Sequence, residues 1–312
     1  MHQIFSLDKF ILNPVMNRFG LQVLRKVLFK LAYNLVTYRY SNDDPDVKDF
    51  KAKGYHVIHD FLSEEEFRDV EREYYQALEE VNSKPKIDHL GHYQLFEVLK
   101  DRNINVHHKV DINDDKYPRV FKCLLYHNRL QEFIKRALGC SYQPFFKQVT
   151  YKAKFERTVQ INPGDQSKYV LKQSSNAQFH SDAVYPVVKA YFLISDVTKD
   201  NGAFRYVPSS NLVSLKQIVR MYRESNRKDL DDVKKGVRKE LDAQRYSDNE
   251  TERYGSIKHF VYPKNTLFFV DTSGMHARGY FLPNKTREIV YIDCRHNPFV
   301  EMRNRLLSKV GS

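Results

Sequence analysis

The sequence has few cysteines, few acidic residues relative to basic ones, and no long apolar run. Its three cysteines, Cys123, Cys140 and Cys294, are far apart and form no CxxC pair, which favours reduced thiols in a cytoplasmic protein over a disulfide framework. No stretch of 18 apolar residues exists, so no segment is expected to span a bilayer. The N-terminus has no apolar core followed by a small-residue cleavage site, which argues against secretion.

The composition is that of a globular protein. Hydrophobic residues make up 41% of the 312 positions and aromatic residues 13%, too much for a disordered chain. A chain of this length can bury a sizeable core, in one large domain or two small ones.

The positive charge is concentrated at the N-terminus. The formal net charge is +12, and residues 1–42 hold six Lys/Arg against a single acid, Asp8. Leucines recur in this segment at steps of three and four, the spacing of one helical face: Leu21, Leu24, Leu28, Leu31 and Leu35. We therefore predict a basic amphipathic helix in residues 1–42, followed by one domain over residues 43–312.

Two roles for this helix remain open from the sequence. It can lie on an anionic membrane surface, because Arg25, Lys26 and Lys30 fall largely off the leucine stripe. It can equally pack its leucines on the body of the protein, as apolar stripes usually do. Nucleic acid is not an expected partner, since the basic residues do not interleave with aromatics in a recognisable binding motif.

The second half of the chain is rich in predicted β-strands. A capping box, Ser63 with Glu66, predicts a helix to about residue 81, and a further helix is expected over 128–138 before Gly139. Alternating β-branched and aromatic runs then predict strands at 148–158, 187–195, 203–207, 258–261, 266–270 and 288–294. Short strands of this kind favour a barrel or sandwich, interrupted by a helical insertion near 212–254.

One segment in this β-rich half has the spacing of a metal site. His180 and Asp182 are two residues apart, so in a strand both side chains point to the same side and can reach one metal ion. A His-x-Asp sequence is weak evidence alone, because about one is expected by chance in this composition. It is the only one in the chain, and a third ligand is available in His276, just after the apolar strand 266–270.

Two histidines and one carboxylate are the ligand set of non-haem Fe(II) oxygenases, which keep positions open for cosubstrate and dioxygen. Arg287 stands eleven residues after His276, at the start of a predicted strand. Its planar guanidinium could bind a carboxylate through two hydrogen bonds. Taken alone, Arg287 would be read as a surface strand residue.

Over residues 50–298 the sequence resembles the phytanoyl-CoA dioxygenase family. The resemblance is most specific at His180-Ser181-Asp182, in the segment 200–210 (DNGAFRYVPSS), and at His276 with Arg287. It implies a mainly β fold with flanking helices, a double-stranded β-helix (jelly roll, cupin-like). It also implies Fe(II) held by His180, Asp182 and His276, and 2-oxoglutarate held by Arg287.

Three further residues are candidates for the site, one of them through the resemblance. Tyr191 falls where relatives carry an aromatic residue beside the cosubstrate, and Tyr185 and Arg205 are candidates for the substrate mouth. The chain departs from its relatives at Ser181, where Gln or Glu is common, and at Asn211, where many have His. These departures bear on which substrate is bound.

The sequence thus predicts an Fe(II)- and 2-oxoglutarate-dependent dioxygenase that consumes O2, releases succinate and CO2, and hydroxylates a substrate. Three substrate classes stay open: a lipid-linked, Kdo-like glycan, an acyl-CoA thioester, or a free small metabolite. The basic N-terminus favours the first and a position on the inner face of a membrane. The alternatives are a jelly-roll binding protein without catalysis and a basic membrane- or nucleic-acid-associated scaffold.

Overall fold

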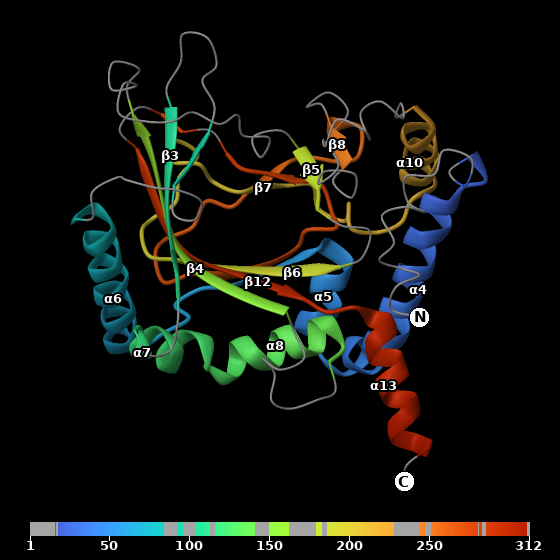
Figure 1. Ribbon diagram of the computed structural model, residues 1–312, viewed down its shortest axis with the longest axis horizontal. Helices are drawn as coiled ribbons and strands as arrows, with labels where there is room; N and C mark the ends of the chain where they lie inside the picture. Colours follow the sequence, from blue (N-terminus) through green and yellow to red (C-terminus); the bar gives the residue numbers. More distant parts are fainter. Residues whose placement is uncertain are drawn as a thin grey trace.

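The computed structural model of the protein describes residues 16, 18–83, 93–96, 104–112, 116–140, 150–161, 179–182, 186–227, 244–246, 251–279, 281–282 and 285–310. In these ranges the strands form two antiparallel sheets, with helices against the outer side of the larger sheet and at one end of the molecule (Figure 1).

The larger sheet has seven strands, and the metal-site candidates lie on or beside the smaller one. The order in the larger sheet is β1 (Tyr55–Ile58), β10 (Leu267–Asp271), β6 (Val187–Leu193), β12 (Thr286–Arg295), β4 (Thr150–Ile161), β3 (Ile104–Asp111) and β2 (Tyr93–Phe96). The order in the smaller sheet is β8 (Gln244–Tyr246), β5 (Phe179–Ser181), β11 (His276–Ala277), β7 (Arg205–Tyr206) and β9 (Lys258–His259).

The helices fall into two groups. Those that pack on the larger sheet are α5 (Pro45–Lys53), α6 (Glu64–Ser83), α7 (Pro118–Val120), the π-helical turn η1 (Phe121–Leu125) and α8 (Asn128–Leu138). Those at the right-hand edge in Figure 1 are α4 (Leu21–Asp43), α10 (Leu215–Arg227) and α13 (Pro298–Val310).

Strand β6 shows how the larger sheet separates two apolar cores. Val188, Ala190 and Phe192 belong to the core shared with the covering helices. Leu193 and Tyr191 belong instead to the core between the two sheets. Successive strand residues face opposite sides, so this alternation assigns the odd-numbered positions of β6 to the interior between the sheets.

Most of the helices and strands predicted from the sequence are present. The strands expected from residue 148 onward correspond to β4, β6, β7, β9, β10 and β12, and the expected helices correspond to α6 and α8. The stretch 212–254 is only partly helical: it contains α10, but Gln244–Tyr246 forms strand β8, which pairs with β5. Helices α5 and α13 were not predicted from the sequence.

Helix α4 lies in the segment where a basic helix was predicted, and of the two open roles for its leucines, packing on the protein is not the one observed at Leu24 and Leu31. Phe29, Tyr33 and Val36 are buried against the protein, whereas Leu24 and Leu31 are exposed. In the described ranges no helix has both the length and the apolar character needed to cross a bilayer.

Candidate metal centre

His180 and Asp182 are held at the end of strand β5. All three residues of this short strand are buried, and His180 lies in its middle. Asp182 follows the strand, and its backbone N–H donates to the carbonyl oxygen of Thr272 at 2.9 Å. The backbone N–H of Thr272 in turn donates to the carbonyl oxygen of Val187 at 3.0 Å. The turn after β10 therefore fixes the backbone next to the carboxylate.

His276 opens strand β11 and lies directly opposite His180 in the sheet. Its Nδ1 lies 3.0 Å from the carbonyl oxygen of Gly274, which assigns the proton to Nδ1 and points Nε2 the other way. Gly274 is required by close packing, because a Cβ there would lie 2.2 Å from the hydroxyl of Tyr206. The turn that carries His276 thus has little freedom to move.

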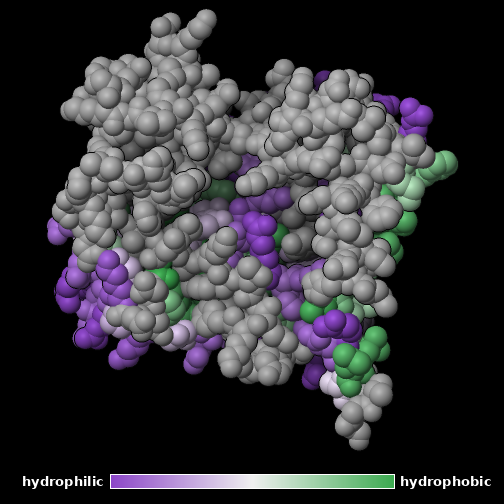
Figure 2. Space-filling model, viewed as in Figure 1, coloured by the Kyte–Doolittle hydropathy of each residue, from purple (hydrophilic) through white to green (hydrophobic). Residues whose placement is uncertain are grey.

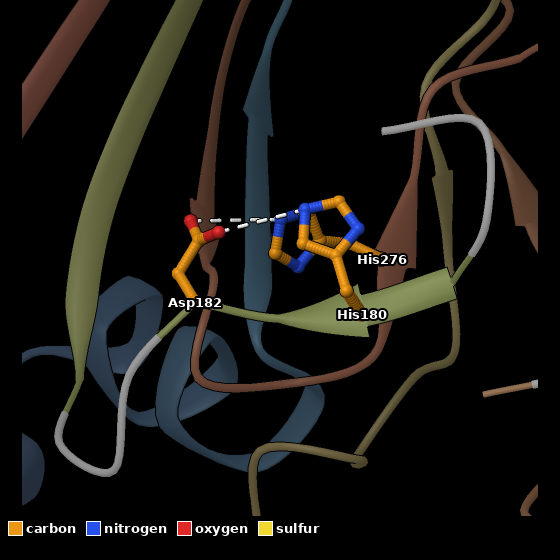
Figure 3. A group of neighbouring side chains, drawn as sticks. All are labelled: His180, Asp182 and His276. Carbon is orange, nitrogen blue, oxygen red and sulfur yellow. Dashed lines mark ion pairs between the residues drawn. The ribbon is translucent and has the colours of Figure 1, made fainter. Parts of the chain in front are cut away.

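The three side chains converge on one point (Figure 3). The Nε2 atom of His180 lies 3.5 Å from Oδ1 of Asp182, and Nε2 of His276 lies 3.6 Å from Oδ2. Neighbouring ligands of an octahedral ion are about 3 Å apart when the bonds are about 2.1 Å. The site therefore has the dimensions and the donor atoms to hold a divalent transition metal, with further positions open.

The electrostatics of the site favour the ligand forms of these groups. Burial raises the pKa of the Asp182 carboxyl. The positive charge of Lys189 and the two neighbouring imidazoles lower it by more, so this pKa lies below its ordinary value. Burial lowers the pKa of His276 to about 3, although Asp182 acts in the opposite direction. At neutral pH the site therefore offers an ionised carboxylate and a neutral imidazole.

Lys189 on β6 is a site residue that sequence reasoning missed. Its ammonium group donates a hydrogen bond to Oδ2 of Asp182. Burial lowers the pKa of Lys189, but the Asp182 carboxylate outweighs that effect and raises it. The signal in the sequence was a single charge in an otherwise apolar strand, at an odd-numbered position that shares the inner face with Tyr191.

Tyr191 and Arg287 both face the interior between the sheets. Tyr191 stacks on Phe268 with ring centroids 5.0 Å apart, and it lies opposite Tyr291 on β12. Arg287 is on the same face of β12 as Tyr291, four residues earlier, and is 6% exposed. One guanidinium nitrogen donates to the carbonyl oxygen of Gly202 at 2.6 Å, which fixes the orientation of the side chain.

The structure does not bring Arg205 to the metal-site candidates. Arg205 pairs with Ala277, the neighbour of His276, so its side chain lies on the opposite face of the smaller sheet. There the guanidinium lies over the ring of Phe179, 4.8 Å from its centroid. Side chains alternate between the two faces along β11, so Arg205, the partner of Ala277, lies on the face opposite to His276. Tyr185, the other candidate for the substrate mouth, lies outside the described residues.

Comparison with known families gives a match over more than half of the chain. The sequence profile described as "Phytanoyl-CoA dioxygenase (PhyH)" matches residues 50–258. This range contains His180 and Asp182, whereas His276 and Arg287 lie beyond its end. Among proteins of curated function, no sequence matches the chain.

Solved structures with a similar fold include two enzymes of nogalamycin biosynthesis. The epimerase SnoN, in complex with Fe3+, alpha-ketoglutarate and nogalamycin RO, has 12% sequence identity and a TM-score of 0.52, with 81% of this chain and 83% of SnoN covered. The alpha-ketoglutarate-dependent carbocyclase SnoK has 17% identity and a TM-score of 0.50, with the same coverage of 81% and 83%. At these identities the likeness concerns the fold.

Proposed function

Because the chain belongs to the phytanoyl-CoA dioxygenase family, we propose that it is an Fe(II)- and 2-oxoglutarate-dependent oxygenase that hydroxylates its substrate and releases succinate and CO2. The observation that carries the proposal is the convergence of His180, Asp182 and His276 within 4.8 Å of one another. Two imidazoles and one carboxylate suit Fe(II) and leave sites for the keto acid and for O2.

In this proposal His180, Asp182 and His276 are the iron ligands, and bound iron supplies the activation of dioxygen. Arg287 binds the distal carboxylate of 2-oxoglutarate, because its guanidinium is planar, permanently charged and already oriented by Gly202. Tyr191 lies beside the cosubstrate, on the same inner face.

The aromatic side chains between the sheets would exclude water from the cosubstrate. Phe204 lies next to the ring of His276, with centroids 5.6 Å apart and planes 21° apart. Tyr191 and Phe268 continue this apolar wall. We infer that the two sheets are the two faces of a double-stranded β-helix, because one apolar core contains residues from both.

For the substrate we propose a small or lipid-linked molecule with hydroxylation as the outcome. A lipid-linked, Kdo-like glycan is supported by the basic charge of the N-terminal segment and by the exposed leucines of α4. An acyl-CoA thioester and a free small metabolite remain the other substrate classes. Halogenation is disfavoured, because Asp182 retains the carboxylate that family-like halogenases replace with a small residue.

The test is anaerobic reconstitution with Fe(II), followed by exposure to O2 and a panel of candidate substrates. We expect one equivalent of iron per chain, and succinate formation coupled to a gain of 16 mass units, about one oxygen atom, in the accepted substrate. His180→Ala provides the matched control. If the folded wild-type protein binds neither iron nor 2-oxoglutarate, the proposal is wrong, and the alternative of a jelly-roll binding protein without catalysis is favoured.

A further inference from the structure

Helix α4 has two apolar faces, and only one of them packs on the protein. Phe29, Tyr33 and Val36 are each 2% exposed. On the other face Leu24 and Leu31 are each 55% exposed, and Leu35 on the same stripe is exposed as well. A soluble surface helix normally presents polar residues on its outer face, so an outward leucine stripe requires an explanation.

Two helices that contact α4, namely α10 and α13, also have exposed apolar residues. Helix α4 packs against α13 through the rings of Phe29 and Phe299, and the hydroxyl of Tyr222 on α10 donates to the carbonyl oxygen of Arg18. We call the exposed apolar residues of this region the leucine face: Phe19, Leu24, Leu28, Leu31, Leu35, Tyr38, Leu215, Val219, Tyr222, Leu306 and Leu307. Figure 2 shows hydrophobic surface at the same edge, at the level of α4 and again lower down near α13.

The charge around the leucine face is positive. Helices α4, α10 and α13 contain eleven Lys/Arg and three Asp/Glu, which is two thirds of the net charge of the whole chain. Lys26 and Glu301 are buried, and Lys30 points inward to Asn211. Among the side chains of these helices that the structure describes, the exposed basic residues are Arg39, Lys216, Arg223 and Arg303, against one exposed acidic residue, Asp43.

We propose that the leucine face docks reversibly on an anionic lipid bilayer, with α4 parallel to the membrane plane. An apolar strip bordered by basic residues is the pattern of interfacial helices, whose apolar side chains enter the boundary between headgroups and acyl chains. A second copy of the chain fits less well, because a two-fold interface would set this basic region against itself. The docking does not depend on the iron chemistry.

The experiment uses full-length protein and sedimentation with vesicles of phosphatidylcholine, with or without phosphatidylglycerol. We expect binding only to the anionic vesicles, and weaker binding at high salt, because salt screens the attraction. The variant Leu24→Gln/Leu31→Gln/Leu35→Gln should bind at least tenfold more weakly and keep its thermal unfolding midpoint, since these side chains are exposed. Val261→Gln, at an exposed apolar residue next to β9, is the matched control and should bind like wild type.

Three results would overturn the proposal. The wild-type protein fails to sediment with anionic vesicles at low salt, or the triple variant binds them as tightly as wild type. The third is a wild-type dimer in sedimentation velocity that the triple substitution converts to monomer, which would assign the face to a second copy. Iron content and 2-oxoglutarate turnover, measured on the same samples, keep this test separate from that of the proposed oxygenase activity.

Discussion

Asp182 interacts with two kinds of partner at once. One carboxylate oxygen faces the imidazole of His180, and the other accepts a hydrogen bond from the buried ammonium of Lys189. We expect His180→Ala, Asp182→Ala and His276→Ala each to abolish iron binding and turnover, because each removes one of three protein ligands. Iron content and succinate formation are the measurements, and full activity in any one variant would remove that residue from the ligand set.

The three variants should differ in stability. Asp182→Ala leaves Lys189 buried without its carboxylate, and removal of one partner of a buried ion pair costs about 3–5 kcal/mol. His180→Ala leaves the pair intact and should unfold at lower cost. Denaturant unfolding of the metal-free proteins gives this order directly, and equal stability of the two variants would show that the ion pair matters little to the fold.

Arg287 is expected to set the affinity for the cosubstrate. Arg287→Ala should raise the 2-oxoglutarate concentration needed for half-maximal succinate formation by tenfold or more, since a bidentate charged contact is lost. Arg287→Lys should restore only part of it, because lysine keeps the charge but not the planar pair of donors. An unchanged cosubstrate requirement in the alanine variant would make Arg287 a structural strand residue.

At this scale the sequence allowed the ligand types to be predicted but not every neighbour. His180 and Asp182 were found because residues two apart in a strand share a side, and the same rule accounts for Arg205, which pairs beside His276 and so faces the other side. The sequence does not indicate a role for Lys189, because its partner Asp182 follows a different strand, β5, and the two meet only in the fold. Only the fold shows that this charge is neutralised.

At the scale of elements, α4 carries a charge into the interior. Lys26 is 7% exposed, and burial lowers its pKa to about 8, helped by Lys30 and opposed by Asp271. At this lysine the unfolded chain, with an ordinary lysine pKa, binds more protons between pH 8 and 10.5, so the unfavourable contribution of Lys26 to stability should disappear as the pH rises through this range. Below pH 8 the burial of the charged form costs at most about 3 kcal/mol.

We therefore expect Lys26→Met to stabilise the protein at pH 7 and to lose that advantage near pH 10.5. Denaturant unfolding of wild type and variant at both pH values provides the comparison, since other titrating groups are common to the two proteins. Lys48→Met, at an exposed position of α5, is the control and should change stability little at either pH. An advantage of Lys26→Met that persists at high pH would show that packing, rather than charge, is the cause.

The same helix shows where element prediction from sequence stops. Helical periodicity predicted α4 itself, but two apolar faces compete in this sequence, and the longer leucine stripe is the exposed one. The face that packs is made of Phe29, Ala32, Tyr33 and Val36, and its choice depends on what lies opposite. In the same way the three residues of β8 are too few to show a strand pattern in the sequence. They form a strand because they pair with β5.

At the scale of the whole molecule, the fold is a mixture of antiparallel sheets and helices rather than mainly β, and the sequence predicted its elements better than its strand order. Alternation located β6, β10 and β12 well, because each has one face toward the helices and one toward the smaller sheet. Their order in the larger sheet brings together segments that are far apart in the chain, with β10 between β1 and β6. Such pairing depends on tertiary contacts that no local pattern contains.

The pairing of His180 with His276 has a consequence for the kinetics of unfolding. Strands β5 and β11 are joined through this single residue pair, while Asp182 and His276 are 94 positions apart in the chain. Closure of so long a loop comes late in folding, because its entropy must be lost before the contact forms. A metal ion bound across the two strands should therefore slow unfolding and leave the folding rate nearly unchanged. Stopped-flow measurements with and without Mn(II) would show a lowered unfolding limb alone, and an accelerated folding limb would mean that the two strands meet early. By lowering the unfolding rate, the bound ion would lengthen the lifetime of the folded state, in addition to any role in catalysis.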